Sequence, residues 1–420
     1  MGTQLTFNPA SPTIMHIDLN SCFASVEQQA NHLLRGKPVV VAAYAKPYGA
    51  ILAPSVEAKL YGVKTGMPVR DALQLCPFLI VREADPPKYR QVHKQIGDLL
   101  NEYSPRVISK SIDEFVLTLP QRTVPKRNSR LQVEKGSSAD EGTVLTGIVQ
   151  EIKSRIRSEI GDYLRVSIGI STNQILAKLA SGLHKPDGFD VIDSHNFLDV
   201  YASINLQEFC GINVRNEARL HRVGIFTPTQ FYEADIQTLK QAFQSVLGRY
   251  WYTRLRGYEI DDVTFAHRSY GQSYVLPRPM AYDEWRPILA KLIAKAARRL
   301  RASGAQATGI GLSLTFGDKT QWHTTHQGKF ALYDDASLLT ATLNLLQSSE
   351  PCKLVKKIAF TCYGLGEDSG QLSCLVDTAK QKSLVASLDR LNNKWGEYSV
   401  SYGSFLGSAG HVRDAIAFGK

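Results

Sequence analysis

The sequence SKSIDEFVL, residues 109–117, places an aspartate and a glutamate side by side in an apolar run typical of a strand. Burial of one carboxylate is costly, and burial of two adjacent ones costs more unless a cation meets them. Neighbouring residues of a regular strand point to opposite faces, so Asp113 and Glu114 can serve one site only where the strand ends or bulges. The alternative is that one of them is a solvated or salt-bridged carboxylate, and the pattern alone leaves both interpretations open.

A second acidic signal lies upstream, in MHIDLNSCF, residues 15–23. Asp18 stands at the end of an apolar strand, and Asn20 and Ser21 are better placed to cap the helix that follows. If Asp18 and Asp113 lie on neighbouring strands, they form a site for hard divalent cations. Mg²⁺ takes one or two carboxylates plus substrate phosphates, and two such ions can clamp the attacking and leaving oxygens of a phosphoryl transfer.

Composition narrows the class of protein. The chain has 420 residues, which predicts two to four domains, and its net charge of +10 favours a polyanionic partner such as nucleic acid or an anionic membrane face. We find no apolar run long enough to cross a membrane, and the first fourteen residues resemble a short disordered lead-in rather than a secretory signal. Six scattered cysteines without a CxxC pair argue against zinc and predict buried free thiols in a reducing compartment.

The periodicity predicts an α+β chain. Strands are expected at 13–19, 38–43 and 164–171, helices at 23–34 and 143–160, and a long exposed basic loop at 121–143. Residues 205–262 are dense in helical pattern, and the chain becomes irregular and Pro-rich around 263–280, as expected of a linker. Beyond it, a strand near 270–276 opens a β-α-β-β-α-β order that ends at 355–363, which is ferredoxin-like, and a last helix follows at 381–395.

These stretches together resemble the Y-family (translesion) DNA polymerases. The likeness rests on IDLNSCFASVE, SIDE, YGVKTGMP, GISTNQILAKLASGLHKPDGF, GINVRNEARLHRVGI and RSYGQSYVLPR, which occur in the order of the family's motifs between about residues 14 and 395. The sequence lies between the bacterial polymerase IV type and the polymerase V catalytic subunit type, because EAK in LAPSVEAKLYG is more similar to the latter.

The resemblance implies a right-hand polymerase with palm, fingers and a helical thumb, followed by a C-terminal ferredoxin-like (βαββαβ) little finger. The implied boundaries are palm 1–23 and 86–200, fingers 24–85, thumb with a helix-hairpin-helix 201–262, linker 263–272, little finger 273–383, and a C-terminal helix and tail 384–420.

The resemblance also implies the chemistry. Asp18, Asp113 and Glu114 would be the catalytic carboxylates that hold two Mg²⁺ ions, with the backbone carbonyl of Leu19 completing one metal's shell. The activity implied is template-directed addition of deoxynucleotides to a primer 3′-hydroxyl, with low fidelity and lesion bypass. Catalysis would come mainly from positioning and electrostatics.

Nucleotide binding is implied at four residues. Phe23 falls at the family's steric-gate position, although it also fits the core face of a helix. The backbone amides of Cys22 and Phe23 would lie near the triphosphate, and Lys185 matches a triphosphate-binding lysine unless it is only a solvated turn residue. The fingers depart from the polymerase IV pattern: Val56 and Lys59 stand where a tyrosine and an arginine grip the triphosphate, so Lys59 keeps a charge but lacks the arginine fork.

DNA contacts are implied in two regions. Gly211 and Asn213 belong to the helix-hairpin-helix, whose amides would hold a phosphate, while Arg278, Lys295 and Arg298 are little-finger cations that either contact DNA or form a solvated face. The stretch GQLSCLVD fits a sliding-clamp box loosely, and a simple loop is the alternative. Its candidate residues are Gln371, Leu372 and Leu375.

The partners expected are primer-template DNA, deoxynucleoside triphosphates and the sliding clamp, for a cytoplasmic, nucleoid-associated monomer without membrane contact. Two other functions remain open from the sequence. A weak or inactive Y-family-like protein could serve as a DNA-binding scaffold for another polymerase. A nucleotide cyclase would also use paired aspartates, but it leaves the helix-hairpin-helix and the basic C-terminal domain unexplained.

Overall fold

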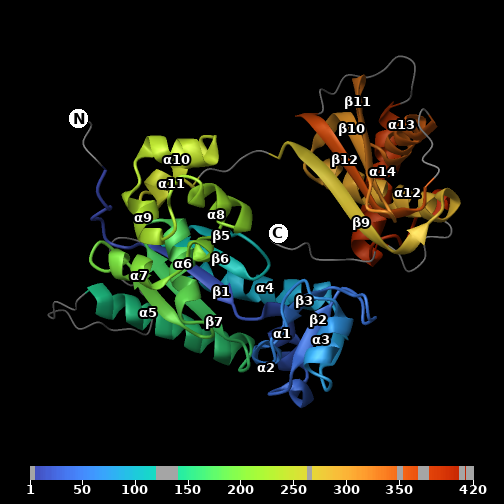
Figure 1. Ribbon diagram of the computed structural model, residues 1–420. Helices are drawn as coiled ribbons and strands as arrows, with labels where there is room; N and C mark the ends of the chain where they lie inside the picture. The colour runs from blue at the N-terminus through green and yellow to red at the C-terminus, as the bar shows by residue number, and fades with distance from the viewer. Residues whose placement is uncertain are drawn as a thin grey trace. The chain divides into compact units, whose positions relative to one another are not determined.

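The computed structural model describes residues 5–119, 141–262, 267–347, 353–367, 378–405 and 412. The chain divides into two compact units near residue 263, which are described separately (Figure 1). The first unit contains a five-stranded sheet, a three-stranded sheet and a group of helices, and the second contains a four-stranded sheet with its own helices. Within the described ranges, no helix is long and apolar enough to cross a membrane.

The five-stranded sheet has the order β5-β6-β1-β7-β8. Strand β1 pairs antiparallel with both β6 and β7, and β8 runs parallel to β7. Its strands are β1 (Ile14–Leu19), β5 (Val107–Ser109), β6 (Glu114–Thr118), β7 (Val166–Ser171) and β8 (Phe189–Ile192). The strands expected at 13–19 and 164–171 are therefore confirmed, and β1 lies at the centre of the sheet.

The two faces of this sheet are covered differently. Met15 and Ile17 of β1 join a core with α4 (Pro86–Leu100), α5 (Glu141–Arg155) and the π-helix η2 (Ile156–Ile160). Alternation places His16 and Asp18 on the opposite face, where α6 (Gln174–Leu183) packs and Ser181 contacts His16. Gly169 permits this close approach, because a Cβ there would lie 2.1 Å from the carbonyl oxygen of Ala177.

The three-stranded sheet has the order β3-β2-β4, and two short helices complete its core. Its elements are β2 (Val39–Ala42), β3 (Ile51–Pro54), β4 (Ile80–Glu83), α2 (Val56–Leu60) and α3 (Val69–Leu75). Helix α1 (Cys22–Ala30) leads into it from β1. The helix expected over 23–34 ends at Ala30, since Asn31 is extended and its side chain accepts from the amide of Leu33, which opens the short 3₁₀ helix η1 (His32–Leu34).

A group of helices completes the first unit, as the density of helical pattern over 205–262 predicts (Figure 1). They are α7 (Phe197–Ser203), η3 (Leu206–Glu208), α8 (Val214–His221), α9 (Pro228–Glu233), α10 (Ile236–Phe243) and α11 (Leu247–Arg254). The N-terminal segment packs on this group: Phe7 stacks on Phe197 with centroids 4.1 Å apart, and buried Arg256 donates to the carbonyl of Leu5. The expectation of a disordered lead-in is therefore wrong from Leu5 onward.

The second unit confirms the βαββαβ order. Its elements are β9 (Ser269–Met280), α12 (Tyr282–Ala302), β10 (Ala305–Phe316), β11 (Gln321–Leu332), α13 (Asp335–Gln347) and β12 (Val355–Glu367). The antiparallel sheet has the order β11-β10-β12-β9, so β12 separates β9 from β10 and β10 separates β11 from β12. Two split βαβ units thus interlock, and α12 and α13 bury one face of the sheet.

Two expected boundaries are wrong. The chain is a strand from Ser269, so residues 269–272 are not linker; β9 tolerates Pro277 and Pro279 because it is an edge strand with a register shift near them. Helix α14 (Thr378–Trp395), which the 3₁₀ helix η4 (Gly403–Phe405) follows, runs through the boundary expected at 383/384.

Three sequence-based expectations concern residues that are partly or wholly undescribed. Most of the basic loop at 121–143 and the candidate clamp residues 370–377 lie outside the described residues. Among the cysteines that the structure describes, Cys22, Cys76 and Cys362 are buried free thiols as expected, whereas Cys210 is exposed.

Candidate active site

A cavity of about 520 Å³ lies in the first unit, where the end of β1 meets the three-stranded sheet. One wall comes from the end of β1 and the start of α1, another from β3 and α2, and a third from the loop that follows α6. The lining residues are Asp18, Leu19, Asn20, Ser21, Cys22, Phe23, Leu52, Ala53, Pro54, Val56, Lys59, Leu60, Thr65, Ile112, Asp113, Lys185 and Pro186. Six of the residues predicted to surround the triphosphate and the metal therefore line the same cavity as Asp18.

The question raised by the adjacent carboxylates is answered by where β6 begins. The strand starts at Glu114, and Asp113 is the last residue of the turn that joins β5 to β6. The carbonyl of Asp113 accepts from the amide of Leu19 at 2.9 Å, which fixes this turn beside the end of β1. Because the strand begins between them, the two neighbouring side chains need not alternate across the sheet.

Asp18 and Asp113 line the cavity together. Burial raises the pKa of Asp18; the charge and hydrogen bond of Lys185 oppose this shift, and the charges of Glu114 and Asp113 add to it. The three carboxylates are therefore close enough to influence one another. The hydroxyl of Ser111 donates to Asp113 and orients its carboxylate.

Glu114 departs from the expected arrangement. It is the cross-strand partner of Asp18, yet it does not line the cavity, and its carboxylate accepts two bonds of 2.7 Å from Lys178 of α6. His16 lies 3.7 Å away on the other side. Burial acts to raise the pKa of Glu114, but the proximity of His16 and the hydrogen bonds and charge of Lys178 outweigh it and lower the pKa to about 2. Of the three carboxylates expected at the cavity, Asp18 and Asp113 line it and Glu114 does not.

The oxygen donors suit a hard cation that also binds the substrate. Among the described residues, no three acidic, histidine or cysteine side chains form a metal site by themselves. Two carboxylates beside an open cavity are nevertheless what Mg²⁺ uses when substrate phosphates and water complete its shell. Asp18 and Asp113 fit such an ion.

Two lysines line the same cavity as these carboxylates. Lys185 Nζ lies 2.7 Å from Asp18 Oδ2, and Lys59 lines the cavity from α2. Desolvation, followed by the charge of Lys185, lowers the pKa of Lys59, although its side chain still reaches solvent. The first turn of α1, with Cys22 and Phe23, adds amides without intrahelical partners, which favour an anion.

Phe23 serves the core and the cavity at once. Its side chain is buried and stacks on Tyr89 of α4, with ring centroids 4.4 Å apart and planes 14° from parallel, and it also lines the cavity. The hydroxyl of Tyr89 donates to Glu27 of α1 at 3.0 Å. The two interpretations of Phe23 are therefore compatible, and the stack holds the ring in one orientation.

The hairpin before α8 has the geometry of a capped helix. Asn213 accepts from the amides of Arg215 and Asn216, both at 3.1 Å, and Gly211 has a φ of +103° that favours glycine. Asn213 itself is extended, so it does not need the left-handed conformation that asparagine tolerates. The two amides already have a side-chain partner, which leaves earlier backbone groups of the hairpin as the ones available to a phosphate.

The three cations of the second unit have protein partners. Arg278 pairs with Glu284, Lys295 lies 3.3 Å from Glu397, and Arg298 donates to Asn393. Lys295 and Arg298 are largely buried under the segment that follows α14, with 13% and 25% of their side chains exposed. A solvated face, the alternative considered from the sequence, is therefore wrong for these two, and their contacts indicate a structural role.

Sequence reasoning missed the groups that hold the acidic residues. Lys178 is the main cation at Glu114, and buried His16 also lies beside this carboxylate. The side chain of Asn20 donates to the hydroxyl of Ser167 in β7. One signal was available: Lys178 stands alone among apolar residues in NQILAKLASGL, and a lone lysine on a buried helix predicts a carboxylate opposite.

Comparisons with known proteins agree with this geometry. Residues 17–182 match the impB/mucB/samB family, and residues 267–374 match that family's C-terminal domain. A DNA polymerase IV of Pelotomaculum thermopropionicum is 32% identical over 415 residues, covering 96% of this chain and 97% of the relative. One of Moorella thermoacetica is 30% identical over 411 residues, covering 95% and 97%. A solved chimeric Y-family DNA polymerase is similar with a TM-score of 0.68 at 22% identity, covering 84% of this chain and 99% of that one, which shows the fold.

Proposed function

Because the chain belongs to the Y-family of DNA polymerases, described also as the impB/mucB/samB family, we propose that it is a template-directed translesion DNA polymerase. It extends a primer by attack of the 3′-hydroxyl on the α-phosphate of a deoxynucleoside triphosphate; the bond from the α-phosphorus to the bridging oxygen breaks, and pyrophosphate leaves. The single observation that carries this proposal is the cavity in which two carboxylates, Asp18 and Asp113, face two ammonium groups, Lys59 and Lys185. Carboxylates that bind metal and cations that bind phosphate are the two halves of a site for a metal-bound triphosphate.

The residues have separate roles in this proposal. Asp18 and Asp113 would hold two Mg²⁺ ions, with the carbonyl of Leu19 as a further ligand, and the ions supply positive charge to the attacking and leaving oxygens. Lys59 and Lys185 bind the triphosphate, and the first-turn amides at Cys22 and Phe23 add hydrogen bonds to it.

Glu114 has a conditional role. Glu114 joins the metal ligands only when its ion pair with Lys178 opens, since both its oxygens accept from that ammonium. We therefore assign the main metal-holding role to Asp18 and Asp113.

The steric gate follows from the fixed ring of Phe23. In this proposal the Phe23 ring, held nearly parallel to Tyr89 at the cavity wall, would exclude a 2′-hydroxyl on the bound sugar. The exclusion acts on shape, so it distinguishes deoxynucleotides from ribonucleotides without reading the base.

We also propose which parts of the chain form the polymerase subdomains. The five-stranded sheet forms the palm (1–23 and 86–200), the three-stranded sheet the fingers (24–85), the helices of 201–262 the thumb, and the second unit the little finger.

DNA would contact the thumb and the little finger. In the thumb the contact is the hairpin at Gly211. In the second unit, small half-buried residues such as Gly311, Ser313 and Thr315 alternate with buried ones along β10, so the face away from the helices admits a DNA backbone closely. Low fidelity, lesion bypass and clamp binding through 370–377 belong to the same proposal.

The experiment is primer extension on a primed template with Mg²⁺. Wild type should extend the primer, Asp113→Asn should lose extension by at least about a thousandfold, and chelation by EDTA should abolish it. Asp98→Asn, an exposed carboxylate on α4, is the matched control and should keep wild-type activity. Folded wild type that binds primer-template DNA but does not extend it would point instead to a DNA-binding scaffold, with Val56 and Lys59 as the residues to restore first.

A further inference from the structure

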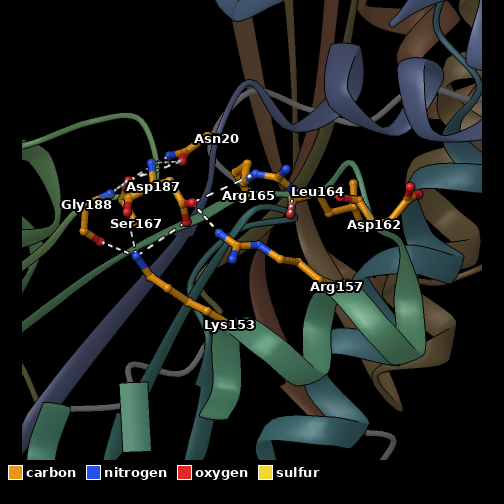
Figure 2. A network of polar contacts seen from close by, with 9 residues as sticks. All are labelled: Asn20, Lys153, Arg157, Asp162, Leu164, Arg165, Ser167, Asp187 and Gly188. Carbon is orange, nitrogen blue, oxygen red and sulfur yellow. Dashed lines mark hydrogen bonds and ion pairs between the residues drawn. The ribbon is translucent and has the colours of Figure 1, made fainter. Parts of the chain in front are cut away.

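The loop that carries Lys185 is held by a network of polar contacts for which the proposed function so far gives no role (Figure 2). It joins α6 to β8 and comprises residues 184–188, with Asp187 at a φ of +60°. That conformation is uncommon for a side chain other than asparagine, aspartate or glycine. Aspartate tolerates it, and because residues 185–188 form no helix or strand, bonds from neighbouring elements hold the loop in place.

Asn20 ties the loop to the end of β1. Its side-chain oxygen accepts from the amide of Asp187 at 2.7 Å, and its amide nitrogen donates to the hydroxyl of Ser167 at 3.0 Å. The amide of Gly188 donates to the same hydroxyl at 3.3 Å. Asn20 and Ser167 are buried, and Ser167 is the cross-strand partner of Asp18, so the loop and the catalytic carboxylate are held by the same strand positions.

Asp187 joins the loop to residues at the end of α5 and in η2. Its carboxylate pairs with Arg157 and lies 3.4 Å from the ammonium of Lys153, and 3.8 Å from the guanidinium of Arg165. Lys153 also donates to the carbonyls of Asp187 and Gly188, at 2.6 and 2.9 Å. Without this carboxylate three cations would face one another, and their repulsion would act on the loop that they hold.

Asn20 and the cations paired with Asp187 hold the loop from two sides. Both sets of contacts include Asp187, which follows Lys185 by two residues. A lysine side chain has four flexible carbons, so the position of its ammonium depends on where its backbone is held. Displacement of a positioned group by about 1 Å is enough to weaken a site severely.

We propose that Asn20 and Asp187 are positioning residues that hold the 184–188 loop and thereby place the Lys185 ammonium for the triphosphate. This inference rests on the proposed function of Lys185 and adds two residues to it. Neither residue contacts the nucleotide in this proposal; both act through Lys185.

The test is a double-mutant cycle on the wild-type chain with primer-template DNA, Mg²⁺ and one deoxynucleoside triphosphate. Asp187→Asn and Asn20→Ala should each raise the KM for the nucleotide about tenfold, with kcat changed less than about threefold. In a Lys185→Ala background the same substitutions should change KM by less than about twofold, since the group they position is gone. Asp162→Asn, which removes the nearby carboxylate paired with Arg35, is the matched control and should leave KM unchanged.

Two results would overturn the inference: an unchanged KM in Asp187→Asn and Asn20→Ala, or an equal rise with and without Lys185. The second result also identifies general misfolding, because damage to the fold acts in both backgrounds. If wild type extends no primer, the proposed function has failed, and the same cycle is then run on the equilibrium Kd for the deoxynucleoside triphosphate, where the same two patterns decide.

Discussion

Lys185 Nζ lies 2.7 Å from Oδ2 of Asp18, so the cation expected to bind a triphosphate also contacts the carboxylate expected to bind metal. The contact with Lys185 does not fully offset the cost of burying the charged carboxylate of Asp18. Burial raises the pKa of Asp18 more than Lys185 lowers it, and the neighbouring Glu114 and Asp113 raise it further. A carboxylate kept ionised at this place is therefore a cost to the fold that the activity requires.

Asp18→Asn should accordingly stabilise the protein while abolishing primer extension. A raised folded-state pKa means that protonated Asp18 favours folding, and this contribution is lost as pH rises through the folded pKa. The neutral amide avoids that loss, so the Tm of Asp18→Asn should exceed that of wild type by roughly 2 °C at pH 7, the shift that about 1 kcal/mol produces in a unit of this size. The difference should vanish below the ordinary pKa of 3.8. If Asp18→Asn has a lower Tm than wild type at pH 7 while the control Asp98→Asn has the wild-type Tm, the expected stabilisation is contradicted.

Glu114 should show the opposite dependence on pH. Its folded-state pKa is lowered to about 2 from an ordinary value of 4.5, so its contribution is complete above 4.5 and is lost as pH falls towards 2. Urea unfolding of wild type and Glu114→Gln should differ by on the order of 3 kcal/mol at pH 7, and the difference should shrink steadily between pH 5 and about 3. A difference that stays constant over that range would mean that the Lys178 pair does not hold the carboxylate ionised.

Phe23→Ala should admit ribonucleotides. Removal of the ring opens the cavity wall where the sugar would lie, so the preference for deoxynucleotides, measured as a ratio of kcat/KM values, should fall at least about tenfold. The unfolding free energy should also fall, by about 3 kcal/mol, because the stack on Tyr89 is lost. Tyr89→Phe keeps the stacked ring and loses only the bond to Glu27, so it should retain wild-type selectivity. Equal loss of selectivity in Tyr89→Phe, which keeps both rings, would contradict the assignment of the gate to the Phe23 ring.

Local pattern was enough for much of the fold. Strand β1 and the βαββαβ order of the second unit are confirmed because their alternation and helical periodicity agree with their burial. The sequence required that a strand end or bulge at Asp113 and Glu114 if both were to serve one site, but it could not decide between these conditions; in the structure, β6 begins at Glu114. The turn at Asp113 depends on the bond from Leu19, almost a hundred residues away in the chain.

The features of the fold and the site that the sequence did not predict depend on tertiary contacts. Glu114 meets Lys178 64 residues further along the chain, and no local pattern fixes that pairing. The prolines of β9 have the pattern of a linker, because an edge strand cannot be recognised before the sheet order is known. Lys295 and Arg298 have the pattern of an exposed helix face, and only their contacts with the end of α14 and the segment after it indicate a structural role.

Arg301 of α12 joins three helices of the second unit. Its guanidinium lies 2.7 Å from Asp335 at the start of α13 and 2.7 Å from Asp389 in α14, with 13% of the side chain exposed. Burial raises the pKa of Asp335, and Arg301 opposes that shift, so the two carboxylates depend on the arginine. Arg301→Met leaves both without their cation and should lower the unfolding free energy by about 3–5 kcal/mol, whereas Arg301→Lys, which keeps the charge without the fork, should lie between it and wild type.

Tryptophan fluorescence in urea measures this unit selectively, because Trp285, Trp322 and Trp395 belong to it and Trp251 alone belongs to the first unit. Arg286→Met, an exposed arginine on the same helix, is the matched control and should unfold within about 0.5 kcal/mol of wild type. If Arg301→Met and Arg286→Met unfold at the same urea concentration, the buried pairs do not hold α14 against the domain. Primer extension by Arg301→Met then distinguishes a structural helix from a functional one: activity that falls in proportion to the unfolded fraction means that α14 only stabilises the second unit.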